Sequence, residues 1–210
     1  MSLDFRTSTQ LVFDFAREAE AERSLAPVAL AAPVALAAPV APKRTRRRRS
    51  LAALRASAPT IADAPRPPCG IDHERPSQRR FDAIVLEMLA RHPLRVKRWR
   101  NTLSGIAVLR IYRDGRQDRS IEAPYPTSAL RLAIFLHEVG HHVLGLGVHR
   151  PRCLEEYLAW RFALDRLAEF GVETEGPVAR RFDRSMRYAV AKAMRRGIRR
   201  LPAELATFVP

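Results

Sequence analysis

Cysteine is scarce in this sequence, which has only Cys69 and Cys153 among its 210 residues. Two cysteines at unrelated positions do not make the disulfide framework that holds small secreted domains together. No C-x-x-C pair is present, so a zinc site built on cysteine thiolates is not expected. Both absences favour a protein of a reducing compartment.

Long uninterrupted apolar runs are missing as well. The first residues include Asp4 and Arg6 and lead into Phe13-Asp14-Phe15, which does not resemble the apolar region of a secretory signal. No stretch reaches the roughly 20 apolar residues that a membrane-spanning helix needs. The sequence therefore predicts a cytoplasmic protein that makes no use of a membrane.

Acidic side chains are outnumbered by basic ones, at 22 against 37, and the formal net charge is +15. An excess of this size favours polyanionic partners, namely nucleic acid, acidic protein segments or anionic lipid. The densest block is KRTRRRRS at residues 43–50. Such a block is normally solvated, and it can contact phosphate backbones without sequence preference. A non-specific contact between this basic tail and nucleic acid is one prediction.

The N-terminal third lacks the patterns of a folded domain. APVALA at residues 26–31 recurs at 32–37, and a proline every six residues prevents a continuous helix. We therefore predict a disordered, low-complexity basic tail over residues 1–75, a folded domain over 76–200 and a C-terminal tail over 201–210.

Apolar spacing within the folded domain predicts both helices and strands. A hairpin turn is expected at Asp114-Gly115, and Thr127 or Ser128 can cap the helix that follows the hairpin. The elements expected are helices over about 77–92, 128–144, 152–170 and 177–196, and strands over 105–112 and 117–123. This order predicts an α+β fold, in which a small β-hairpin or sheet packs on the helix at 128–144 and on the helices after it.

The helix at 128–144 carries the run His137-Glu138-Val139-Gly140-His141. Residues four apart lie on the same face of a helix, so His137 and His141 can both reach one tetrahedral metal ion. Glu138 lies about 100° around the helix, beside such a metal. There it can take a proton from a water activated by the metal and pass it to the leaving amine. The run fits the pattern H-E-x-x-H.

The surroundings of the run strengthen the metal interpretation. Most of the helix circumference is apolar, which predicts that the helix is buried. Imidazole and carboxylate groups in such a helix are costly unless they are paired or coordinated. The competing interpretation is a helix whose core histidines are hydrogen-bonded and bind no metal.

A zinc site needs a third protein ligand. The three-histidine arrangement H-E-x-x-H-x-x-G-x-x-H fails, because Leu144 and Gly147 stand where a glycine and a histidine are required. On the next helix Glu156 falls on the apolar face, where a buried acid needs a partner, whereas Glu155 falls closer to the polar side. Glu156 is therefore the predicted third ligand, and Glu155 and His149 remain alternatives.

Three neighbours of the predicted site have both a functional and a structural interpretation. His142 could stabilise an oxyanion or gate the site, but a structural role beside the ligands is favoured. Tyr157 could donate to a tetrahedral intermediate, but packing is favoured because its position on the helix points away from Glu156. Cys153 is expected to be a packed thiol.

RLAIFLHEVGHHVLG followed by EEYLAWRFA resembles the ImmA/IrrE family of gluzincin-type metallopeptidases, over about residues 81–170. The resemblance implies a zincin-like domain, two histidine ligands from H-E-x-x-H and a third ligand from the downstream helix, here Glu156. It also implies that an edge strand near Ile121-Glu122-Ala123 holds the substrate backbone. Trp160 departs from related proteins, which often carry Asp or Asn there to orient a histidine; Glu155 or Asp165 would have to replace it.

Two functions are consistent with these patterns. The first is a cytoplasmic zinc metallopeptidase in which Glu138 activates water to cleave a protein or peptide, with a repressor or another transcriptional regulator as a candidate substrate. The second is a non-catalytic zinc-containing regulatory protein that binds nucleic acid or a protein partner through its basic tail.

Overall fold

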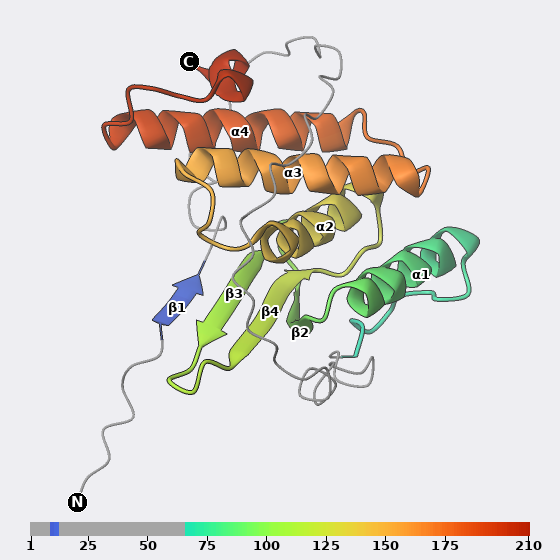
Figure 1. The fold of residues 1–210 in the computed structure, drawn as a ribbon. Helices are drawn as coiled ribbons and strands as arrows, with labels where there is room; N and C mark the ends of the chain where they lie inside the picture. Colours follow the sequence, from blue (N-terminus) through green and yellow to red (C-terminus); the bar gives the residue numbers. More distant parts are fainter. Residues whose placement is uncertain (1–8, 13–65) are drawn as a thin grey trace, which may run out of the picture.

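The computed structural model describes residues 9–12 and 66–210 and has a mixed α+β architecture (Figure 1). A small sheet lies beneath a stack of helices. The Ala/Pro/Val repeat and the basic run at 43–50, with the nucleic-acid contact predicted for that run, lie outside the described residues.

The sheet has four strands in the order β1-β3-β4-β2. Its centre is the predicted hairpin, formed by β3 (Ile106–Ile111) and β4 (Gln117–Pro124) in antiparallel register. Gly115 has a φ of 81° in the connecting turn, a backbone conformation that glycine adopts without strain. The hairpin was correctly predicted from two strand-like runs on either side of the Asp114-Gly115 turn.

The two outer strands were not predicted. β1 (Thr9–Val12) pairs antiparallel with β3, so this part of the segment expected to be disordered is a strand. β2 (Arg95–Arg100) pairs parallel with β4. Its sequence, RVKRWR, does not look like a strand because four of its six residues are basic. The fold compensates those charges from β4, where Glu122 lies 3.0 Å from Arg98 and 3.6 Å from Lys97.

The four predicted helices are present, with ends within two residues of those expected. α2 packs on β3 and β4, α3 packs on α2, and α4 packs on α3 (Figure 1). α1 lies at the side of the sheet and adds Ile84, Val85 and Met88 to the core. The helices are α1 (Pro76–Arg91), α2 (Ala129–Leu144), α3 (Arg152–Glu169) and α4 (Pro177–Arg195).

α2 is the central helix of the domain. Its first turn is capped by Ser128, whose side chain accepts a hydrogen bond from the Arg131 amide, and it ends at Gly145 with a φ of 89°. Every residue from Leu132 to His142 is buried. No helix among the described residues, α2 included, combines the length and apolar character needed to cross a bilayer.

The C-terminal segment differs from the tail expected there. Residues Ala203–Phe208 form a short 3-10 helix, η2, which packs on α4 and α3. Leu205 is fully buried and Phe208 is 9% exposed. Burial of these two apolar side chains explains why the segment folds back onto the domain.

Candidate metal centre

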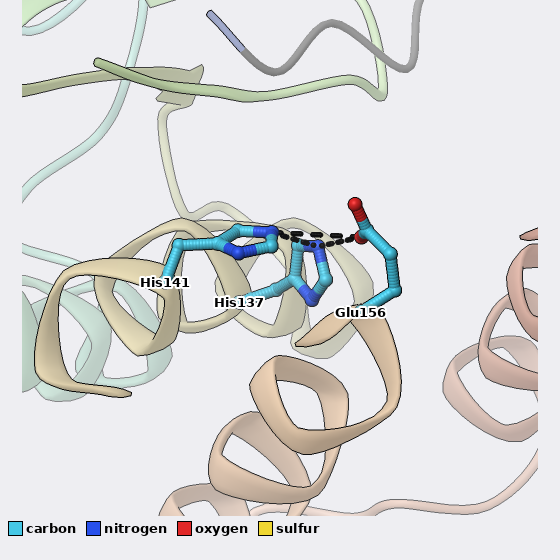
Figure 2. Close-up of side chains that lie close together, drawn as sticks. All are labelled: His137, His141 and Glu156. Carbon is cyan, nitrogen blue, oxygen red and sulfur yellow. Dashed lines mark hydrogen bonds and ion pairs between the residues drawn. The ribbon is translucent and has the colours of Figure 1, made fainter. Parts of the chain in front are cut away.

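Three buried side chains meet between α2 and α3: His137 and His141 from α2, and Glu156 from α3 (Figure 2). Their ligand atoms all lie within 4.8 Å of one another. The Nε2 atoms of the two histidines are 3.2 Å apart, and Oε2 of Glu156 lies 3.4 Å from His137 Nε2 and 3.5 Å from His141 Nε2. The group could hold a metal ion.

A close approach of α2 to α3 allows this meeting. Gly140 lies between the two histidines, and a Cβ there would come 3.0 Å from the carbonyl oxygen of Ala159 and 3.0 Å from Phe162. With hydrogen in place of a side chain, α2 can lie against the backbone of α3. The carboxylate of Glu156 then reaches both imidazoles.

Burial and mutual attraction govern the charges of this group. Burial lowers the pKa of His137 to about 4, against the opposing effect of Glu156. Burial also disfavours the charged form of His141, but the carboxylates of Glu156 and Glu155 raise its pKa to about 10. The same histidines lower the pKa of Glu156 below its ordinary value despite its burial. The group is therefore built around an ionised carboxylate.

Glu155 lies on the other side of His141. Its Oε1 is 3.4 Å from His141 Nδ1, and its Oε2 accepts a hydrogen bond of 2.8 Å from the Gly147 amide. The prediction that Glu155 lies towards the polar side of α3 is wrong, because it is only 1% exposed. The loop after α2 folds back over the first turn of α3 and encloses it. Glu155 and Asp165 were the two acids considered as partners that orient a ligand histidine. Glu155 contacts His141, whereas Asp165 pairs with Arg161.

One aromatic contact and one hydrogen bond fix the histidines of α2 further. The ring of Trp160 lies against that of His137, with centroids 4.6 Å apart and planes inclined by 34°. Trp160 thus supports His137 by ring packing. An Asp or Asn at this position would instead accept a hydrogen bond from a histidine. His142 Nε2 lies 3.0 Å from the Ser120 carbonyl oxygen and ties α2 to β4, the structural role expected of it.

Glu138 lies beside the three ligand atoms, in a cavity that it shares with His137. Its Oε2 is buried and has no hydrogen-bond partner among the described residues, and burial raises the pKa of the carboxyl to about 8. Gly105, which directly precedes β3, lies over it, since a Cβ there would clash with the carboxyl of Glu138. The cavity is also lined by Ile134, Trp160, Arg181 and Ser185.

Several residues considered from the sequence lie outside this group. His149 lies in the loop after α2. Tyr157 packs against Phe182 and Phe208, with ring centroids 6.3 Å away in each case, and Cys153 is buried, as expected for both.

The expectation that Ile121-Glu122-Ala123 forms an edge for substrate is wrong. β4 lies inside the sheet, and its backbone is paired with β3 on one side and with β2 on the other. A peptide strand cannot add to it, because the hydrogen-bonding groups that strand addition uses are already occupied.

Sequence reasoning missed Gly105 and Arg181. Gly105 was visible only as the start of a strand, and Arg181 is one of several arginines on a strongly basic helix. Nothing in the local sequence of either residue indicates that it faces Glu138; both reach it through the packing of β3 and α4 around α2.

Comparison with protein families, with curated proteins and with solved structures finds no match to the chain.

Proposed function

We propose that this protein is a zinc-dependent peptidase that holds zinc through His137, His141 and Glu156. The observation that carries the proposal is the spacing of the three ligand atoms. Ligands about 2.0–2.1 Å from a tetrahedral zinc ion lie about 3.3–3.4 Å from one another. The separations here are 3.2, 3.4 and 3.5 Å. Three nitrogen and oxygen donors leave a fourth position open, as catalytic zinc sites require.

The buried carboxylate also supports a bound cation. Oε2 of Glu156 is buried and aimed between the two imidazoles, with their Nε2 atoms at 3.4 and 3.5 Å. These distances are long for hydrogen bonds, so the imidazoles offset the cost of the buried charge only in part. A divalent ion at this point would offset that cost better than the imidazoles alone.

Zinc, when bound, supplies Lewis acidity that polarises a peptide carbonyl and makes a water easier to deprotonate. Glu138 is the residue placed to take that proton, because its carboxylate lies in the cavity next to His137. The water oxygen then bonds to the carbonyl carbon, the C–N bond breaks, and Glu138 returns the proton to the departing nitrogen. A buried carboxyl whose pKa is raised by burial suits both directions of transfer.

We further propose that the domain is zincin-like and related to the ImmA/IrrE peptidases. The support is the combination of H-E-x-x-H on a buried helix with a glutamate ligand from the next helix. By the same resemblance the substrate would be a protein, with a transcriptional regulator as the first candidate to test.

The Glu138→Gln variant tests the proposed chemistry. A tryptic peptide mixture of a bacterial proteome is incubated with the zinc-loaded protein, and new peptide termini are identified by mass spectrometry. Wild-type protein and a Glu169→Gln control, altered at an exposed acid of α3, should produce the same new termini. Glu138→Gln should keep zinc and produce none, since an amide cannot accept the proton. Equal cleavage by Glu138→Gln would reject this role.

A further inference from the structure

Arg181 reaches the candidate site from α4, far from the motif in sequence. It lines the cavity that contains His137 and Glu138, one helical turn before Ser185, which lines the same cavity. Its Nη2 donates a hydrogen bond of 2.9 Å to the carbonyl oxygen of Leu103, in the loop between β2 and β3. The guanidinium is therefore held in place beside the general base.

Arg181 forms no close ion pair with any described residue, although the carboxyl of Glu138 in the same cavity acts on its charge. Its Nε is buried and has no hydrogen-bond partner, and among the described residues no acid lies within ion-pair distance of it. Other arginines on α3 and α4 do have such partners: Arg161 pairs with Asp165, and Arg187 with Asp183. A partly buried cation without a partner is costly, and an arriving anion would remove that cost.

We propose that Arg181 contacts the substrate and stabilises negative charge on the oxygen of the attacked peptide carbonyl. The inference rests on the proposed peptidase function. When the water oxygen bonds to the carbonyl carbon, the C=O π electrons move to the carbonyl oxygen and leave it negatively charged. Arg181 is the cation that lines the cavity, its guanidinium makes no close ion pair within the described part of the chain, and it lies beside the residue that takes the proton. A guanidinium can donate two hydrogen bonds to such an oxygen at close range.

A purely structural role is the competing explanation, because Arg181 also anchors the loop at Leu103. The two explanations differ in what they predict for anion binding. An anchor affects thermal stability and leaves anion affinity of the folded, zinc-loaded protein unchanged. A substrate-contacting cation affects anion affinity directly.

Inorganic phosphate, a tetrahedral oxyanion, serves as the probe, and its affinity for the zinc-loaded full chain is measured by calorimetry. Arg181→Met should bind phosphate about 10- to 100-fold more weakly, the effect expected for losing a hydrogen bond to a charged group. Arg181→Lys keeps the charge and should recover part of the affinity. Arg180→Met, which removes a neighbouring exposed arginine, should match the wild type. Zinc content and melting temperature are measured for each variant.

The outcomes separate this inference from the proposed function. If the wild type binds zinc but Arg181→Met and Arg181→Lys bind phosphate as tightly as it does, the role of Arg181 is overturned and the zinc peptidase stands. If the zinc-loaded wild type binds no phosphate, the role of Arg181 is likewise overturned and the zinc peptidase stands. If the wild type takes up no zinc, the proposed function fails, and this inference fails with it. If Arg181→Met does not fold, the phosphate affinity of Arg181→Lys decides. A lower affinity than that of the wild type, raised again by added guanidinium, supports the role of Arg181, and an affinity equal to that of the wild type overturns it.

Discussion

Two adjacent acids, Glu155 and Glu156, have different tasks at the candidate site. Glu156 points between the Nε2 atoms of the two histidines, whereas Glu155 faces Nδ1 of His141 from behind. Helical spacing was sufficient to predict that His137 and His141 share a face, that Glu138 lies beside them and that Glu156 is buried. It could not place Glu155, because the loop just before α3 covers this residue and the path of that loop does not follow from helical spacing.

The contact between Glu155 and His141 should affect metal affinity. A carboxylate that accepts from the second nitrogen of a ligand histidine fixes the ring and makes it a stronger ligand, and losing it typically costs about 10- to 100-fold in affinity. We expect Glu155→Gln to retain the zinc stoichiometry but to bind the ion more weakly by this factor in competition with a chelator. An unchanged affinity would show that His141 is oriented without Glu155.

At the scale of elements, helices and the hairpin followed from local patterns, since each buries one regular set of side chains. β2 did not, because its basic residues are stabilised by Glu122 and Asp118 on a strand about 20 residues later in the chain. β1 depends on pairing with β3 across about 100 residues. Strand pairing between distant segments is not encoded in the periodicity of either one.

The approach of α2 to α3 depends on Gly140, and Gly140→Ala should disturb both packing and the site. Alanine gains about 1 kcal/mol of helix propensity. Its Cβ would meet the Ala159 backbone at 3.0 Å, and such overpacking costs about 1–3 kcal/mol. We expect a net loss of about 1 kcal/mol in urea denaturation, together with weaker zinc binding, because the ligands come from both helices. Greater stability with unchanged zinc affinity would contradict this account of the interface.

At the scale of the whole molecule, a partly buried network fixes α1 to the segment that enters α2. Asp82 on α1 accepts hydrogen bonds from the Tyr125 hydroxyl at 2.9 Å and from Gln78 Nε2 at 2.7 Å, and it pairs with His73. Gln78 Nε2 also donates to the Pro126 carbonyl oxygen. The network holds the start of α2, and hence its histidines, against the rest of the fold.

Asp82 gives the network a defined pH dependence. Burial raises the pKa of its carboxyl, but the hydrogen bonds from His73, Gln78 and Tyr125 outweigh burial and bring it below the ordinary 3.8. A depressed pKa stabilises the fold above pH 3.8, and this contribution is lost as pH falls through the lower folded value. Asp82→Asn should therefore cost about 1–3 kcal/mol in urea denaturation at pH 7 and clearly less at pH 3. The same cost at both pH values would be inconsistent with this role, and Asp165→Asn, at an exposed pair, serves as the control.

The cavity around Glu138 is the part of the site that the sequence could not show. Gly105 precedes β3 and Arg181 lies on α4, so they are separated from the motif by about 30 and 40 residues. Their approach depends on how the whole domain packs around α2. The ligands of the candidate centre are predictable because two helices carry them at regular spacing; the groups that would contact substrate are not.

The central claim is that His137, His141 and Glu156 bind zinc, and the metal content of the full chain tests it most directly. Purified protein is stripped with a chelator, reloaded with zinc, dialysed and subjected to elemental analysis. We predict about one zinc ion per chain for the wild type and for Glu169→Ala, and none retained by Glu156→Ala at the same folded fraction. A wild type that retains no zinc, or a Glu156→Ala variant that retains one ion per chain, would contradict the claim.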